Sequence, residues 1–171
     1  MQNRIEIEYI YGATLRVAPF FLSPMMEIKA PQTESEWKAY YALRFCVLRE
    51  PWNQPLGSEV LTDENQAIHA IAVENGVILG VARLHESGDN QGQVRCVAIA
   101  TEAQGKGIGK AMMAYLEAQA MEKGWTEIVL EARENAVPFY EAIGYMVEAE
   151  SYLLFGEIQH YRMKKALNHS V

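Results

Sequence analysis

The sequence predicts a mixed α/β (α+β) fold, with a mostly antiparallel central sheet that contains one parallel strand pair and has helices on both faces. Two observations predict it. Three consecutive strand patterns joined by short turns occupy residues 67–100, as in an antiparallel meander. A helical pattern then separates the last of these strands from another strand pattern at residues 125–131. A strand–helix–strand unit of this kind pairs its two strands in parallel, with a right-handed crossover.

Length and composition indicate one globular domain. The chain has 171 residues, of which 50% are hydrophobic and 10% aromatic, and this supplies enough apolar surface for a core. Residues 1–24 are expected to be an N-terminal extension of unknown role, and residues 25–167 the folded domain. No apolar run approaches the roughly 18 residues of a membrane span, and the start of the chain lacks the features of a signal peptide. We therefore expect a cytoplasmic protein with no membrane partner.

Charge and cysteine content exclude further classes of protein. The formal net charge is −7, from 15 Lys and Arg against 22 Asp and Glu, which argues against general affinity for nucleic acid. Cys46 and Cys96 both lie in apolar surroundings, so we expect buried free thiols in a reducing compartment. Two cysteines cannot form a zinc site alone, and no metal is expected.

The first predicted elements are a short strand and a long helix. The strand is expected at Glu27 to Lys29. Thr33 and Glu36 have the spacing of a capping box, so a helix should run from about Glu34 to Arg49 and end before Pro51. Apolar residues that recur on one face of this helix are Trp37, Tyr40, Tyr41, Phe45 and Leu48.

A long loop and the meander follow. Residues 50–65 read as a loop, and a loop of this length in a compact domain is often functional. The first turn of the meander is predicted at Asn75-Gly76, because both residues tolerate positive φ. The third strand is apolar on both faces and should be central. The three strands are expected at residues 67–73, 77–84 and 93–100, with the second turn at residues 88–92.

The rest of the chain alternates helices and strands. A helix is predicted from Gly107 to Lys123, with Gly124 as its C-terminal stop. Asn135 can cap a short helix that ends near Gly144. The remaining strands are expected at residues 125–131, 145–155 and 158–163, the last two hinged at Gly156.

The glycine-rich segment Gln104 to Lys110 leaves a buried strand and enters a helix. Glycines let the backbone approach a ligand closely, and free amides at a helix start favour a phosphate or pyrophosphate. Lys106 and Lys110 add positive charge. The spacing excludes the P-loop and the G-x-G-x-x-G dinucleotide pattern, so a nucleotide-binding module is a minor alternative. A glycine-rich turn without a ligand stays open at this point.

Two motifs carry a resemblance to a known family. Gln104-Gly105-Lys106-Gly107-Ile108-Gly109 resembles the Q/R-x-x-G-x-G/A signature of the GNAT superfamily of N-acetyltransferases. Pro138-Phe139-Tyr140-Glu141-Ala142-Ile143-Gly144-Tyr145 resembles its F-Y-x-x-x-G-F/Y helix and turn. The resemblance covers about residues 26–165 and implies the acyl-CoA N-acyltransferase fold, whose parallel strand pair is splayed. Residues 43–48, Asp63-Glu64, His69 and the ending at residues 156–163 are similar to a small bacterial subgroup.

The resemblance implies acetyl-CoA as the acyl donor. Its pantetheine arm would pair with the strand before the loop, as in β-augmentation, and loop amides would hold its pyrophosphate. Many family members carry an Asn at the position of Arg133, so Arg133 would contact the cofactor or an acidic substrate; Asn135 is a further cofactor candidate besides its role as a cap. The implied cofactor-binding residues are Val97, Ala98, Ile99, Gln104, Gly105, Lys106, Gly107, Ile108, Gly109, Lys110, Arg133 and Asn135.

Acetylation of an amine needs a base and a proton donor for the departing thiolate. The resemblance makes Tyr140 the general acid. The base is open: Glu131 and His85 lie at strand ends and are the main candidates, while Glu86, His69 and His160 are alternatives. Cys96, a strand thiol with no His partner, is expected to be inert.

The function expected from the resemblance is acetyl transfer from acetyl-CoA to a primary amine by direct attack. The alternative is an acyl-CoA-binding sensor or interaction module without catalysis. The acceptor, a small molecule or a peptide, should contact the loop at residues 50–65 and the hairpin near Phe155-Gly156. Acidic residues there hint at a cationic amine: Glu59, Asp63, Glu64 and Glu157. Because many family members dimerise, a homodimer is also compatible with the resemblance.

Overall fold

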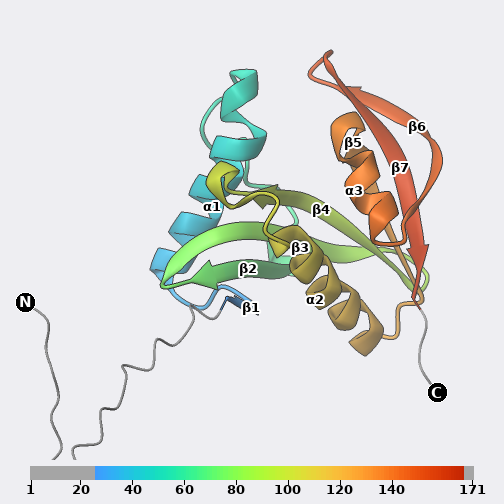
Figure 1. Cartoon of the computed structure of the whole chain (residues 1–171), viewed down its shortest axis with the longest axis horizontal. Helices are drawn as coiled ribbons and strands as arrows, with labels where there is room; N and C mark the ends of the chain where they lie inside the picture. Colours follow the sequence, from blue (N-terminus) through green and yellow to red (C-terminus); the bar gives the residue numbers. More distant parts are fainter. Residues whose placement is uncertain (1–25, 168–171) are drawn as a thin grey trace, which may run out of the picture.

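The computed structural model describes residues 26–167, so the expected extension at residues 1–24 lies outside the described part. The described chain forms one seven-stranded sheet in the order β1-β2-β3-β4-β5-β7-β6, with three α-helices (Figure 1). The strands are β1 Glu27–Lys29, β2 Ile68–Glu74, β3 Val77–Gly88, β4 Gln91–Ile99, β5 Glu127–Arg133, β6 Met146–Leu154 and β7 Ile158–Ala166. The helices are α1 Glu34–Leu48, α2 Ile108–Glu122 and α3 Val137–Ala142.

The predicted fold class and order of elements are confirmed. The β4–β5 pair is parallel and every other neighbouring pair is antiparallel. β4 is the central strand, as its apolar character predicted. The capping box is present, with the Glu36 amide donating to Thr33 Oγ1 over 3.2 Å and the Thr33 amide donating to Glu36 Oε2 over 3.1 Å.

Several element boundaries differ from the predicted ones for local reasons. The β3–β4 turn is only Asp89-Asn90, since Asn90 adopts φ 58°, and both strands are longer than predicted. β5 begins at Glu127 because the Trp125 amide still donates to the Ala120 carbonyl of α2. β7 extends to Ala166 because its residues 160–166 pair with the whole length of β5.

Helices cover both faces of the sheet, as predicted. Alternation along β2 separates the two cores: Ile71 packs on the α1 side, while Ala70 and Ala72 pack on the α2 side. α3 lies on the same face as α2, where Tyr140 joins the α2 core. None of the helices within residues 26–167 combines the length and the apolar character that a membrane crossing requires.

Two local expectations are wrong. Cys46 is exposed on α1, because it faces away from the sheet, and Cys96 is only half-buried, so neither thiol is fully buried as expected. Asn135 does not cap α3, because it lies within the 3-10 turn Glu134–Ala136. The N-cap position of α3 is Ala136, which makes no side-chain capping bond.

A buried network of charges ties the 50–66 segment to the sheet. Arg44 of α1 and Arg83 of β3 are both 0% exposed. Arg83 forms a two-pronged contact with the Asp63 carboxylate, with both N–O distances 2.9 Å. Arg44 Nη2 lies 2.9 Å from Glu64 Oε1. The two arginines therefore fix the end of this segment beneath α1, although charged residues are seldom buried without such partners.

We predict that Arg44→Met destabilises the fold by about 3 kcal/mol, because it leaves the Glu64 carboxylate buried without its main partner. The measurement is the free energy of unfolding in urea. Lys38→Met, on the exposed face of the same helix, is the control and should change this free energy by less than about 0.5 kcal/mol. Equal losses in the two variants would contradict the role of the buried pair.

Candidate active site

The candidate site begins where β4 and β5 stop pairing. Their register runs from Gln91↔Glu127 to Val94↔Leu130 and ends there, and the strands then diverge toward their carboxyl ends (Figure 1). On the other side of β4, a bulge at Cys96, with φ 55°, shifts its register against β3. Beyond Val94, the backbone groups of β4 that face β5 therefore have no ladder partner in β5, as the splayed pair of the predicted fold requires.

The glycine-rich loop forms the next part of the site. Gly105 has φ 74°, and Gly107, with φ 81°, occupies the position before the first turn of α2. An added Cβ at either glycine would meet nothing within 4 Å, so the surface over the loop is open. The first turn of α2 has no acidic residue and no capping side chain, and its amides are free for an anion. Lys106 and Lys110 are exposed beside them.

Other members of the predicted loop set have different environments. Ile108 is buried in the α2 core, so only its backbone amide can reach a ligand. Gly109 lies inside α2, where an added Cβ would be 3.2 Å from the Phe139 ring; it lets α3 approach α2. Gln104 folds back, and its side-chain nitrogen donates to the Ile99 carbonyl over 3.3 Å. Asn135 is exposed in the turn after β5.

Tyr140 is the predicted acid, and α3 holds it beside the diverging strands. Its side chain is 8% exposed and packs edge-on against Phe139 and Tyr145, with ring centroids 4.9 and 5.8 Å away. Burial raises the pKa of Tyr140 well above its ordinary value, although the nearby positive charge of Arg133 opposes the shift. The hydroxyl therefore keeps its proton at neutral pH and can act as a donor.

Glu131, one of the two main candidates for the base, lies where β4 and β5 diverge. It is the first β5 residue after the last pair with β4, and its side chain is 16% exposed. Oε1 lies 3.3 Å from Arg162 Nη1 of β7. Oε2 is buried and has no hydrogen-bond partner among residues 26–167. An oxygen in this state can accept a proton or a hydrogen bond from a ligand or water.

The structure does not bring His85 to the same place. His85 lies opposite Gln93, where β3, β4 and β5 are still paired. Burial and then the charge of Arg83 lower its pKa. His69 is bound on both ring nitrogens, at 3.1 Å from the Tyr40 hydroxyl and 2.8 Å from the Glu64 carbonyl.

His160 and Glu86 complete the set of alternatives for the base. His160 Nδ1 lies 2.9 Å from the Ile158 carbonyl, and its ring stacks on Tyr152. Glu86 is exposed on β3. Of the predicted bases, Glu131 is thus the one that lies at the divergence with a buried, unpartnered oxygen.

A cavity of about 440 Å³ opens at the carboxyl end of β4, between α1 and the glycine-rich loop. Arg133 extends into it with its guanidinium carbon 5.8 Å from the centroid of the Trp52 ring. Sequence reasoning identified the 50–65 loop but not Trp52; an aromatic residue in a polar loop was the available signal. The cavity is lined by Leu43, Cys46, Val47, Pro51, Trp52, Ala100, Thr101, Glu102, Gln104 and Arg133.

Three of the four acidic residues expected to attract a cationic amine are engaged within the protein. Glu59 is buried and accepts a hydrogen bond from the Gly57 amide at 2.8 Å. Asp63 and Glu64 are paired with Arg83 and Arg44 in the buried network. Each of these three carboxylates therefore has a partner within the protein that the linear sequence does not reveal, while Glu157 is exposed in the turn between β6 and β7. The described residues also form no group of three or more His, Cys, Asp or Glu suited to a metal ion.

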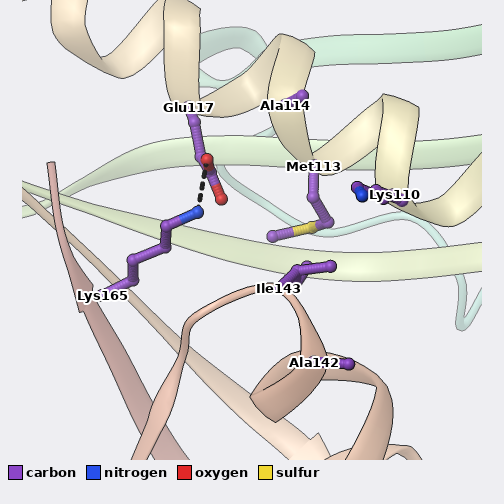
Figure 2. Close-up of a pocket in the computed structure, with 7 residues that line it drawn as sticks. All are labelled: Lys110, Met113, Ala114, Glu117, Ala142, Ile143 and Lys165. Carbon is purple, nitrogen blue, oxygen red and sulfur yellow. Dashed lines mark hydrogen bonds and ion pairs between the residues drawn. The ribbon is translucent and has the colours of Figure 1, made fainter.

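A second hollow, of about 290 Å³, lies between α2, α3 and β7 (Figure 2). Lys165 reaches from β7 to Glu117 of α2, with Nζ 2.8 Å from Oε2. Met113 and Ile143 point into the space between the helices (Figure 2). Lys110 lines the same hollow, so the side of α2 that follows the glycine-rich loop continues into it. Because Glu117 and Lys165 are paired with each other, this hollow has fewer charged groups free to bind a ligand than the cavity at β4.

A mixed sheet with a splayed parallel pair, and an open glycine-rich loop at the helix after it, define an acyl-CoA-dependent transferase class. The sequence profile described as the Acetyltransferase (GNAT) family matches residues 26–145. The chain therefore belongs to the GNAT family of acetyltransferases. It is 27% identical over 140 residues to the uncharacterized N-acetyltransferase YjcF of Bacillus subtilis, covering 82% of this chain and 99% of the relative.

Solved structures agree on the fold. An aminoglycoside 6'-N-acetyltransferase complexed with coenzyme A is similar with a TM-score of 0.73 and 14% identity, over 85% of this chain and 99% of that one. The ribosomal-protein-S18-alanine N-acetyltransferase from Escherichia coli has a TM-score of 0.69 and 17% identity, over 86% and 97%. With the family membership, the protein is an acetyl-CoA-dependent N-acetyltransferase.

We predict a pH dependence of stability that originates at Asp63. Hydrogen bonding to Arg83 lowers the pKa of Asp63 to about 2, so this contact stabilises the fold above about pH 4 and is lost as pH falls toward 2. Wild type should be more stable than Asp63→Asn at pH 6, and the difference should shrink between pH 4 and 2. Thermal unfolding at each pH measures it. A constant difference across this range would exclude the ion pair as its source.

Proposed function

We propose that this protein transfers the acetyl group of acetyl-CoA to a primary amine by direct attack, with Tyr140 as the general acid. The observation that carries the proposal is the end of β4–β5 pairing at Val94 and Leu130, with Tyr140 on one side and Glu131 within the divergence. Acetyl-CoA supplies an activated acyl group. The protein supplies the groove, the anion site and two proton-handling side chains.

The residues around the groove fit a cofactor with a diphosphate and an amide-bearing arm. The open loop at Gly105 and Gly107, followed by the free amides of α2, suits the diphosphate. The unpaired edge of β4 at Val97, Ala98 and Ile99 suits the arm, because amides of the arm can satisfy strand groups that β5 leaves unpaired. Lys106 and Lys110 would add charge attraction from the exposed side of the loop.

The two proton transfers follow from the environments of Tyr140 and Glu131. Glu131, through its buried and unpartnered Oε2, accepts a proton from the amine by way of a water molecule. The amine nitrogen forms the new bond to the acyl carbon as the carbon–sulfur bond breaks. Tyr140, held protonated by burial, donates its hydroxyl proton to the departing sulfur. The pairing of Glu131 with Arg162 keeps the carboxylate aimed along the sheet.

The alternative is an acyl-CoA-binding module that has lost catalysis. One observation favours considering it: Arg162 already engages one oxygen of Glu131, which leaves only the other oxygen for a substrate. An acetyl-transfer screen over amino acids, polyamines, aminoglycosides and peptides separates the two functions. Turnover on any amine supports the enzyme, while acetyl-CoA binding without turnover on the whole panel supports the module.

We predict that Gly107→Ala weakens acetyl-CoA binding by at least about tenfold, because a methyl group there strains the φ 81° backbone and covers the open anion site. Gly124→Ala is a matched control at the other end of α2, since Gly124 has φ 79° and is equally open. Both variants should lose similar stability. Calorimetric titration should show weaker acetyl-CoA binding only for Gly107→Ala. Equal affinity for acetyl-CoA in the two variants would show that the diphosphate does not bind at Gly107.

We predict that Tyr140→Phe lowers kcat about 100-fold and leaves the acetyl-CoA dissociation constant unchanged, because it removes the proton donor but keeps the packed ring. Steady-state kinetics on an acceptor found in the screen measure the effect. Tyr145→Phe is the control, since it removes a hydroxyl that donates to Glu117, away from the groove. Unchanged kcat in Tyr140→Phe would reject the acid role.

A further inference from the structure

Two arginines near the cavity at β4 form no ion pair within residues 26–167, and of these Arg133 lines the cavity. Arg133 leaves the end of β5 and stacks over Trp52, and Arg49, just after α1, places its guanidinium carbon 5.9 Å from the centroid of the Phe155 ring. None of the ion pairs formed by residues 26–167 involves either arginine. Arg49 donates instead to two neutral carbonyls, those of Ser58 and Leu48, each at 3.1 Å.

The two cations also act on each other. Burial lowers the pKa of Arg133, and the positive charge of Arg49 lowers it further. Like charges brought together in a partly buried place are unfavourable unless an anion offsets them. Their aromatic contacts with Trp52 and Phe155 offset only part of this cost.

No carboxylate within residues 26–167 forms an ion pair with either arginine, although Glu102 also lines the cavity. Asp63 and Glu64 are held in the network under α1. Glu131 has one oxygen on Arg162 and presents the other within the divergence. It lies two residues before Arg133 on the same face of β5, a spacing of about 6–7 Å along the strand. Arg133 therefore has no ion-pair partner within residues 26–167 and lies close to the proposed base.

We propose that the acceptor is a small amine that also carries an anionic group, and that Arg133 and Arg49 bind this group while the amine lies at Glu131. The proposal rests on the proposed function and names its class of substrate. The anionic group is a carboxylate or a phosphate, both of which match the planar donor fork of arginine. This assigns Arg133 to the acceptor, in place of the cofactor contact that the family resemblance also allowed.

The test compares matched amines that differ in charge: amino acids against their carboxamides, and O-phosphoethanolamine against ethanolamine. Two readouts are used with the full chain, the release of free CoA thiol from acetyl-CoA and calorimetric binding of each amine to protein saturated with CoA. The variants are Arg133→Gln and Arg49→Gln. Lys38→Gln, which removes an exposed charge on α1, is the control.

The wild type and Lys38→Gln should favour the anionic amine of a pair by about tenfold or more in kcat/KM and in affinity. Arg133→Gln and Arg49→Gln should each remove most of this preference by raising KM, with kcat and the acetyl-CoA dissociation constant within about twofold of wild type. The carboxylate and phosphate pairs identify which anion is preferred.

Three results would overturn the proposal: equal use of the charged and uncharged amines, failure of every anionic amine to bind the CoA-loaded protein, or weaker acetyl-CoA binding in Arg133→Gln with the preference intact. Failure of the proposed function looks different. In that case no amine releases CoA thiol, yet the calorimetric preference for the anionic amine and its loss in the arginine variants persist.

Discussion

The active site depends on the point at which β4 and β5 cease to pair. β5 continues to pair with β7 as far as Arg133, while β4 continues to pair with β3 past the bulge at Cys96. The sheet therefore opens between β4 and β5 beyond Val94 and Leu130. Opening a sheet exposes backbone groups that are otherwise paired, which is unfavourable unless water or a ligand satisfies them. The divergence is thus both a cost to the fold and the source of its binding groove, and an extended ligand with its own amides is suited to it.

The two faces of the sheet provide different parts of the candidate site. The α2 face provides the glycine-rich loop and, from α3, the buried Tyr140. The α1 face provides Glu131, Arg133 and the 50–66 segment, which the buried arginines hold in place. In our proposal the donor binds from the first face and the acceptor from the second, so that they meet only where the strands diverge. The charged network under α1 would then act on the acceptor side alone, by fixing the segment that carries Trp52.

Local patterns predicted the fold, and partners distant in sequence explain most of what they missed. Turn residues such as Asn75-Gly76, the capping box and the helix after the glycine-rich loop each act over a few neighbours, so periodicity and spacing were enough. Arg44 and Arg83 are a different case, because charged residues in a helix or strand ordinarily face water. Only the tertiary contact with Asp63 and Glu64 makes their burial favourable. The glycine motif located the loop that leads into α2, but the difference between Gly107, open to solvent, and Gly109, packed on Phe139, is a property of the assembled helices.

The charge of the acceptor site shows why net charge is a poor guide to a cleft. The chain carries a formal charge of −7, and its 50–65 loop contains four acidic residues, which together suggest a cationic ligand. The folded chain uses three of these carboxylates internally, against arginines of α1 and β3 and a backbone amide of the loop itself. The guanidiniums of Arg133, which lines the cavity, and of Arg49 nearby stay outside these ion pairs and are held by carbonyls and aromatic rings. In our proposal the specificity for the acceptor follows from these two charges, which folding leaves without an ion-pair partner among residues 26–167.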